Sequence, residues 1–180
     1  MKHRVFVAIR VSQKLQEEVV KWTSAHTRLP VRWIAPENLH VTLIPPWYEE
    51  AIERVEVEVA NALQEAHPFP IEFETVSYGP TPKNPRLIWA TGTTPQELTT
   101  LAKNLHKALK TPSENRPFQL HLTIARFRSE IFSSIPLKKL DERVVWAQTV
   151  DAVELMESHL KPSGAQYETL ARFPLSRAVS

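Results

Sequence analysis

The chain has 180 residues, a net charge of +2 and no cysteine. Its length suits one domain with a sizeable core, and the absence of cysteine excludes disulfide bonds and thiolate metal sites. The N-terminus leads into only five apolar residues, at 5–9, which is too short for the apolar core of a signal peptide, and no run approaches a membrane span. We therefore expect a soluble cytoplasmic protein with no membrane attachment.

Hydrophobic periodicity predicts alternating strands and helices along the chain. Ser12 is a suitable N-cap for the first helix, and Thr94 followed by Pro95 is a typical start for the third. Pro45 and Pro46 are expected to end the strand before them, because proline cannot donate to a sheet ladder. The predicted elements are, in order, a strand at 5–9, a helix at 12–26, strands at 31–34 and 40–44, a helix at 49–66, strands at 69–78 and 87–91, a helix at 94–110, a strand from 121, a helical turn within 129–140, and strands at 144–150, 153–160 and 167–173.

One four-residue pattern occurs in two of these strands, as His40-Val41-Thr42-Leu43 and as His121-Leu122-Thr123-Ile124. Successive side chains of a strand point to opposite faces, so each copy places its histidine and threonine on one face and its apolar residues on the other. Two such strands facing each other would form a small polar cleft with two bases and two hydroxyl groups. These groups suit in-line attack on a phosphodiester.

The order of strand, helix and histidine strand also occurs twice. Val5 precedes His40 by 35 positions, and Leu87 precedes His121 by 34. A repeat of about 80 residues in so short a chain predicts two pseudo-symmetric lobes and not a solenoid, whose repeats are shorter and more numerous. We expect a single two-lobed domain over residues 1–180, with repeats at about 1–80 and 81–180 and a lobe boundary in the loop at 81–85.

Aromatic residues near the two motifs could stack on a nucleobase. Trp47 and Tyr48 are the candidates for this role, because they follow the first motif in a segment marked by prolines. Phe6, Trp33 and Trp89 are expected to pack in the core. No histidine pair has the helical spacing and acidic neighbours of a metal site, so no metal is expected.

The duplicated motifs resemble those of the 2H phosphoesterase superfamily, which carries two His-x-Thr/Ser strands in a duplicated α+β chain. Within it, the sequence is similar to the bacterial and archaeal RNA 2′,3′-cyclic phosphodiesterases, once named 2′-5′ RNA ligases. The family commonly has a Phe-Leu-Gly turn after its first motif, whereas this chain has residues 44–47, Ile-Pro-Pro-Trp, so we expect a differently shaped loop there. The likeness extends over nearly the whole chain, through segments 4–9, 33–40, 87–89, 121–126, 164–167 and 172–175.

Two opposed histidines can supply one neutral base and one cationic acid for hydrolysis of a cyclic phosphate, while Thr42 and Thr123 bind its non-bridging oxygens. The resemblance gives the direction: His40 is the proton donor to the departing 3′-oxygen, and His121 is the proton acceptor that activates water. It also links Arg126 to the phosphate site. Strict alternation places Arg126 on the face opposite His121, so a bulge or the end of the strand must turn it inward.

The expected architecture is α+β, with two pseudo-symmetric lobes that are each an antiparallel sheet with outer helices, and an active-site cleft between them. The resemblance implies hydrolysis of 2′,3′-cyclic phosphate ends of RNA to 2′-phosphates without a cofactor. Expected partners are RNA with such ends or cyclic nucleotides, and the expected state is a monomer. Three alternatives stay open: a 2′-5′ RNA ligase, a phosphodiesterase of small cyclic nucleotides, and a non-catalytic module that binds RNA ends.

Overall fold

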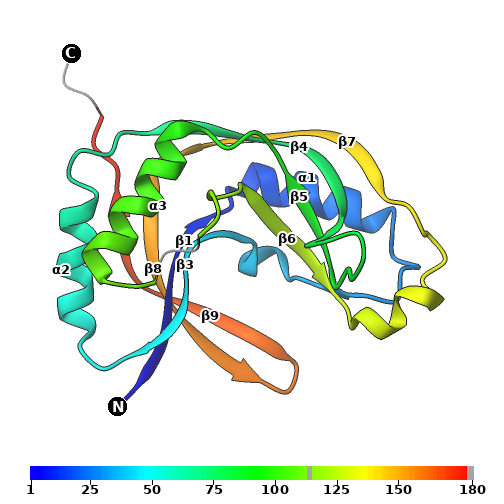
Figure 1. Ribbon diagram of the computed structural model, residues 1–180, viewed down its shortest axis with the longest axis horizontal. Helices are drawn as coiled ribbons and strands as arrows, with labels where there is room; N and C mark the ends of the chain where they lie inside the picture. The colour runs from blue at the N-terminus through cyan, green and yellow to red at the C-terminus, as the bar shows by residue number, and fades with distance from the viewer. Residues whose placement is uncertain (113–114, 178–180) are drawn as a thin grey trace.

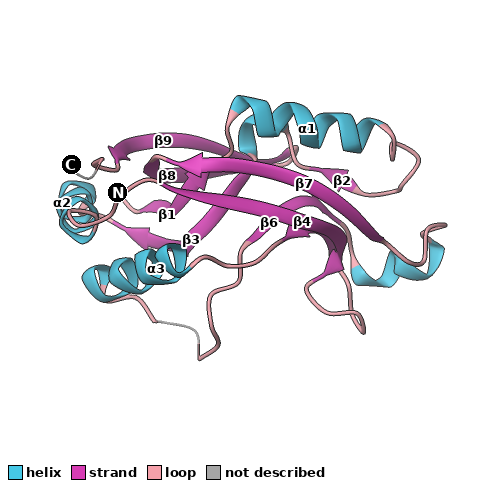
Figure 2. Ribbon diagram, turned by 90° about the horizontal axis from the view of Figure 1, so that it is seen from above, coloured by secondary structure: helices cyan, strands magenta, loops and turns pink. Residues whose placement is uncertain are grey.

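Two antiparallel sheets form the centre of the protein (Figures 1 and 2). The computed structural model describes residues 1–112 and 115–177. Sheet A has the strand order β3-β1-β8-β9 and sheet B has the order β2-β6-β5-β4-β7. The elements are β1 (His3–Arg10), α1 (Gln13–Ser24), β2 (Arg32–Trp33), η1 (Pro36–Asn38), β3 (His40–Glu49), α2 (Ile52–Ala62), β4 (Phe69–Gly79), β5 (Leu87–Thr91), α3 (Gln96–Leu109), β6 (His121–Arg126), η2 (Ser129–Ser134), β7 (Asp141–Val150), β8 (Ala152–Lys161) and β9 (Gly164–Pro174).

The two sheets are pseudo-symmetric, as the sequence predicts. In each sheet the histidine strand pairs with the first strand of its own repeat: β3 pairs with β1, and β6 pairs with β5. The register is equivalent as well, since His40 lies opposite Arg10 and His121 lies opposite Thr91. The order β3-β1-β8-β9 therefore corresponds to β6-β5-β4-β7, and β2 is an addition to the edge of sheet B.

The two lobes nevertheless do not coincide with the two halves of the sequence. β4 and β5 lie on either side of residues 81–85 and are paired neighbours in sheet B, so the lobe boundary expected in this loop is wrong. Each sheet draws strands from both halves, and the helices pack on the sheet of the other repeat: α1 lies against β7, whereas α3 lies against β3 and α2 (Figure 1). The internal repeat itself remains a prediction of the sequence.

The core is continuous between the sheets, because a single cluster of packed apolar side chains includes residues of both sheets and all three α-helices. Members from each are Val5, Leu15, Val55, Leu98 and Leu122, and none of these five is more than 1% exposed. A second, smaller cluster lies on the other face of sheet A and contains Phe6, Ala8 and Met156. None of the helices in the described ranges has the length and apolar character that crossing a membrane requires.

The prolines after the first motif do not end its strand, contrary to expectation. β3 continues from His40 to Glu49 through Pro45 and Pro46. Two features permit this. β3 is the edge strand of sheet A, and the prolines lie at a bulge where both face the single residue Phe6 of β1.

The helix starts show one correct and one wrong prediction. Ser12 caps α1, with its Oγ accepting from the backbone N–H of Leu15 at 3.3 Å. The N-cap of α3 is Pro95 and not Thr94. The Thr94 hydroxyl instead accepts from the backbone N–H of Leu120 at 2.8 Å, so it holds the residue directly before the second motif.

Candidate active site

His40 begins β3 and is oriented by the turn before it. Its Nδ1 lies 2.7 Å from the carbonyl oxygen of Asn38, the last residue of η1. A carbonyl oxygen can only accept a hydrogen bond, so Nδ1 carries the proton. In the neutral imidazole, Nε2 is then the nitrogen with a free lone pair.

His121 begins β6 and repeats this arrangement. Its Nδ1 lies 2.9 Å from the carbonyl oxygen of Gln119, two residues earlier. The same reasoning leaves Nε2 of His121 as the nitrogen available for proton transfer. The two histidines therefore present the same ring nitrogen, from equivalent positions in two sheets.

Both histidines line one cavity of about 70 Å³. Pockets for drug-sized ligands measure roughly 300–1,000 Å³, so this cavity suits a group of a few atoms such as a phosphate, and a ribose and base would lie outside it. The wall is polar on both sides because each motif contributes its threonine. The lining residues are Ile34, Asn38, His40, Thr42, His121, Thr123, Arg126 and Tyr167.

Arg126 reaches the cavity because β6 contains a bulge. Trp89 of β5 pairs with Thr123, and the next residue, Ile88, pairs with Ala125, so Ile124 is the extra residue. Ile124 and Ala125 are accordingly both buried, which breaks the alternation and returns Arg126 to the face of His121. Within the described part of the chain, the guanidinium of Arg126 makes no hydrogen bond or ion pair.

The surroundings of His40 disfavour its cationic form. Burial lowers the pKa of His40 below its ordinary value, and the positive charges of Arg126 and Arg10, together with that of His121 whenever it is protonated, lower this pKa further. The hydrogen bond to the Asn38 carbonyl acts in the opposite direction. The free protein therefore holds His40 neutral at pH 7.

Tyr167 is one of three cavity residues, with Ile34 and Asn38, that the sequence analysis did not assign to the site. Its ring centroid lies 5.1 Å from that of His40 and 4.9 Å from that of Phe6, and the latter two rings are 5.1 Å apart. Tyr167 comes from β9, and it lies within a segment, 164–167, whose likeness to the family was the one available signal. The rings of Phe6 and Tyr167 therefore restrict the movement of the His40 imidazole.

Among the other aromatic candidates, the residues close to the two histidines are not those predicted to stack on a base. Phe6 is buried, as expected, but it also contacts His40. Trp89 lies 5.3 Å, between ring centroids, from His121. Trp47 and Tyr48 are strand residues near the far end of β3, roughly 20 Å from His40 along the strand, and neither lines the cavity. The expectation that they lie in a loop beside the site is wrong.

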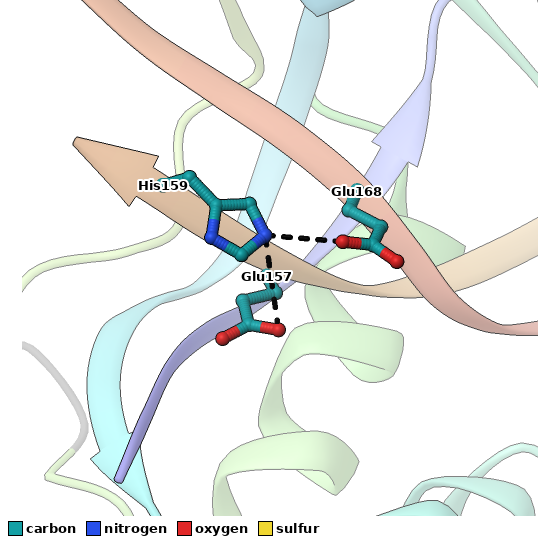
Figure 3. Close-up of side chains that lie close together, drawn as sticks. All are labelled: Glu157, His159 and Glu168. Carbon is teal, nitrogen blue, oxygen red and sulfur yellow. Dashed lines mark hydrogen bonds and ion pairs between the residues drawn. The ribbon is translucent and has the colours of Figure 1, made fainter. Parts of the chain in front are cut away.

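A second group of titratable side chains lies on sheet A, away from the cavity. Nε2 of His159 is 3.1 Å from a carboxylate oxygen of Glu168 and 3.9 Å from one of Glu157 (Figure 3). Glu157 and Glu168 are directly opposite in β8 and β9, where like charges repel, and His159 offsets this repulsion when protonated. Nδ1 of His3 adds a further contact to Glu157 at 2.9 Å. The carboxylates are thus engaged by histidines, and we interpret the group as an ion-pair network.

The chain is similar to a known protein family and to curated relatives. A family model described as "2′-5′ RNA ligase superfamily" matches residues 11–162. A protein of Archaeoglobus fulgidus named RNA 2′,3′-cyclic phosphodiesterase is 30% identical over 94% of this chain and 99% of its own length. A protein of Aquifex aeolicus with the same name is 27% identical over 96% of this chain and 97% of its own.

Solved structures share the fold. The protein TT0787 of Thermus thermophilus aligns with a TM-score of 0.79 at 22% identity, over 98% of this chain and 100% of that one. LigT of E. coli in its apo form aligns with a TM-score of 0.75 at 24% identity, over 98% and 99% of the two chains. The α+β architecture of two antiparallel sheets with helices, predicted from the sequence, is thereby confirmed.

Proposed function

The chain belongs to the 2′-5′ RNA ligase superfamily, and on this basis we propose that it hydrolyses the 2′,3′-cyclic phosphate at the end of an RNA to a 2′-phosphate. One observation carries the proposal. His40 and His121 line the same small cavity, each with Nδ1 bonded to a backbone carbonyl and Nε2 left for proton transfer. Relatives named RNA 2′,3′-cyclic phosphodiesterase support the substrate.

The reaction needs one proton removed and one delivered. His121 takes a proton from water through Nε2 as the water oxygen attacks phosphorus. The bond from phosphorus to the 3′-oxygen breaks, and Nε2 of His40 donates a proton to that oxygen. The products are a 2′-phosphate monoester and a free 3′-hydroxyl, and the histidines exchange protons with solvent before the next turnover.

His40 must gain its proton when the substrate arrives, because it is neutral in the free protein. The guanidinium groups of Arg126 and Arg10 lower its pKa, and an anionic phosphate in the cavity offsets their charge. The substrate therefore raises the pKa of the group that it needs as an acid. Binding of the cyclic phosphate and protonation of His40 are coupled in this scheme.

Thr42, Thr123 and Arg126 bind the phosphate in this proposal. The two hydroxyl groups donate to its non-bridging oxygens, and the Arg126 guanidinium, which has no other partner within the described residues, offers charge-assisted hydrogen bonds. Since the cavity accommodates only the phosphate, the ribose, the base and the rest of the RNA extend outside it. A monomeric state and a cytoplasmic location stay part of the proposal.

Incubation with the four nucleoside 2′,3′-cyclic monophosphates and with a short RNA bearing a 2′,3′-cyclic end tests the proposal. The reactions contain EDTA, and the products are resolved as 2′- or 3′-phosphates. We expect a 2′-phosphate in chelator, lost in His40→Ala and in His121→Ala but kept in His159→Ala, a histidine variant remote from the cavity. Binding of the RNA end without turnover in the wild type would instead identify a binding module.

Ligation is the second candidate function, since the family model that matches the chain describes 2′-5′ RNA ligases. In that reaction a 5′-hydroxyl replaces water as the nucleophile, and the same two histidines serve. Adding an RNA with a 5′-hydroxyl end to the incubation separates the two activities. A joined product that forms faster than the hydrolysed one would make ligation the principal activity.

A further inference from the structure

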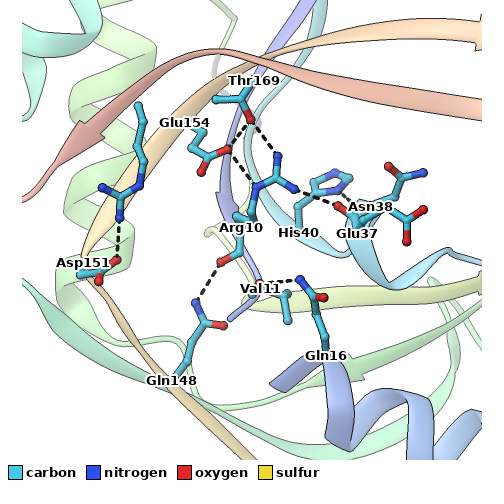
Figure 4. Close-up of polar contacts among 11 residues, drawn as sticks. Arg10, Val11, Gln16, Glu37, Asn38, His40, Gln148, Asp151, Glu154 and Thr169 are labelled. Atoms are coloured by element: carbon cyan, nitrogen blue, oxygen red, sulfur yellow. Dashed lines mark hydrogen bonds and ion pairs between the residues drawn. The ribbon is translucent and has the colours of Figure 1, made fainter. Parts of the chain in front are cut away.

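A buried carboxylate lies close to the proposed site without lining it. Glu154 of β8 is 7% exposed, and it is the one charged side chain in the described ranges that is buried. A carboxylate removed from water must be paired and hydrogen-bonded to be tolerated. Its partners are Arg10, whose Nε donates at 3.1 Å, and Thr169, whose hydroxyl donates at 2.7 Å (Figure 4).

The Arg10 guanidinium is held on three sides. Besides Nε on Glu154, its Nη2 donates to the Thr169 hydroxyl at 2.8 Å, and its Nη1 donates to the backbone carbonyl of Glu37 at 2.9 Å. All three nitrogens therefore have protein partners. Arg10 differs in this respect from Arg126, whose guanidinium is not engaged by any described residue.

The contact with Glu37 connects Arg10 to the catalytic histidine. Glu37 belongs to η1, and the carbonyl of the next residue, Asn38, is the one that accepts from Nδ1 of His40 at 2.7 Å. Arg10 is also the residue directly opposite His40 in the pairing of β1 with β3. The side chain thus spans from the strand beside His40 to the turn that orients its ring.

The backbone of Arg10 is fixed as well. Its carbonyl accepts from Nε2 of Gln148 at 3.1 Å (Figure 4). Oε1 of the same glutamine accepts from the backbone N–H of Ser12 at 2.9 Å. Gln148 lies on β7 of sheet B, so these two hydrogen bonds join the end of β1 to the other sheet. Arg10 is therefore held both at its backbone carbonyl, by Gln148, and at its guanidinium, by Glu154. Held in this way, its side chain is a rigid support for the η1 turn.

We propose that Arg10 is a positioning residue for His40, supported by Glu154 and Thr169, and that it holds the η1 turn so that the Asn38 carbonyl keeps the imidazole aimed into the cavity. The inference rests on the proposed function, in which His40 transfers a proton. Arg10 acts through His40 alone. Its loss therefore lowers the rate of the chemical step and leaves binding of a mononucleotide largely unchanged.

The variant that tests this is Arg10→Met combined with Glu154→Gln, which removes the cation without leaving a buried carboxylate unpaired. Glu154→Gln alone is the intermediate variant, because it removes the counter-ion of Arg10 and keeps the Arg10 side chain. Arg172→Met is the matched arginine control: Arg172 lies on β9, is 52% exposed and pairs with Asp151 at 3.5 Å, away from the η1 turn. Thermal unfolding verifies that every variant is folded.

With a nucleoside 2′,3′-cyclic monophosphate, we expect kcat of the double variant to fall about tenfold to a hundredfold, as for a misplaced catalytic group, with KM within about threefold of the wild type. Arg172→Met keeps kcat within about threefold, and Glu154→Gln alone lowers kcat less than the double variant does. In a His40→Ala background the same double change causes no further loss, because the group it positions is gone. A folded double variant with unchanged kcat, or with the same fractional loss in the His40→Ala background, would overturn the inference.

A readout independent of turnover separates this inference from the proposed function. The ¹⁵N shifts of the His40 ring report which nitrogen carries the proton. We expect the wild type to show an Nδ1–H ring and the double variant to show a mixture of tautomers. If the wild type hydrolyses no cyclic phosphate, the proposed function fails, and this comparison still decides the role of Arg10: identical ring shifts in both proteins would refute it.

Discussion

His40 and His121 begin strands in different sheets, and each donates Nδ1–H to the carbonyl oxygen two residues before it, at 2.7 and 2.9 Å respectively. The contact is local, so each strand start orients its own imidazole. The packing of the two sheets against each other then brings both rings to one cavity. The same tautomer is imposed twice, and proton donor and acceptor differ only in their surroundings.

Replacing either histidine removes one of the two proton transfers. We expect His40→Ala and His121→Ala each to lower kcat/KM by about 100-fold or more, the range of general acid–base catalysis. Steady-state hydrolysis of a nucleoside 2′,3′-cyclic monophosphate measures the effect, with His159→Ala as the control. Turnover near the wild-type level in both single variants would exclude the mechanism.

The pKa of His40 should be measurable by NMR titration of its ring. Because burial and the positive charges of Arg126 and Arg10 disfavour the cation, we expect a pKa below the ordinary 6.5 in the free protein. Arg126→Gln removes one of those charges and should raise this pKa. A downward movement on that substitution, or a wild-type pKa above 6.5, would contradict the electrostatic picture.

The same pKa affects stability. In the unfolded chain His40 binds its proton at an ordinary pKa near 6.5, whereas in the folded protein it binds the proton only at lower pH. Between these two values the unfolded state holds more protons, so the free energy of unfolding from His40 falls as pH decreases through this window. Urea unfolding at several pH values measures the slope, and His40→Ala should reduce it.

Arg126 is expected to contribute to phosphate binding through charge-assisted hydrogen bonds. Arg126→Ala should reduce kcat/KM by about tenfold to a hundredfold, as expected for the loss of an ionic contact with the phosphate. Arg54→Ala is the surface control, since Arg54 is 53% exposed and its partners among the described residues are Glu49, at the end of β3, and Glu58 of α2. Equal kcat/KM values for the two variants would show that Arg126 does not bind the phosphate.

Gln148 joins the sheets by two hydrogen bonds to backbone groups of Arg10 and Ser12. Gln148→Leu leaves that carbonyl and that N–H without this partner, so we expect a loss of about 1–3 kcal/mol in the free energy of unfolding. Chemical denaturation measures it. Gln64→Leu, at an exposed position after α2, is the control and should change stability far less. Equal losses of stability in the two variants would show that the hydrogen bonds of Gln148 do not stabilise the fold.

Local patterns were sufficient for most of the secondary structure and for the two motifs. Alternation and turn residues predicted the strands that contain His40 and His121, and Ser12 caps its helix as expected. These features depend on residues close in sequence. The prediction failed where a distant partner competes for the same group, as for the Thr94 hydroxyl, which bonds Leu120 and not its own helix.

The sequence by itself therefore determined which side chains share a face within each His-x-Thr motif. Only the tertiary structure decided how the sheets meet: β4 and β5 pair across the expected lobe boundary, and a bulge opposite β5 returns Arg126 to the cavity. Tertiary structure also brings Tyr167 to His40, more than a hundred positions away in the sequence, and Arg10 to Glu37, 27 positions away. Side-chain direction is a local property of an extended backbone, whereas neighbours across strands depend on pairings between distant segments that local periodicity does not encode.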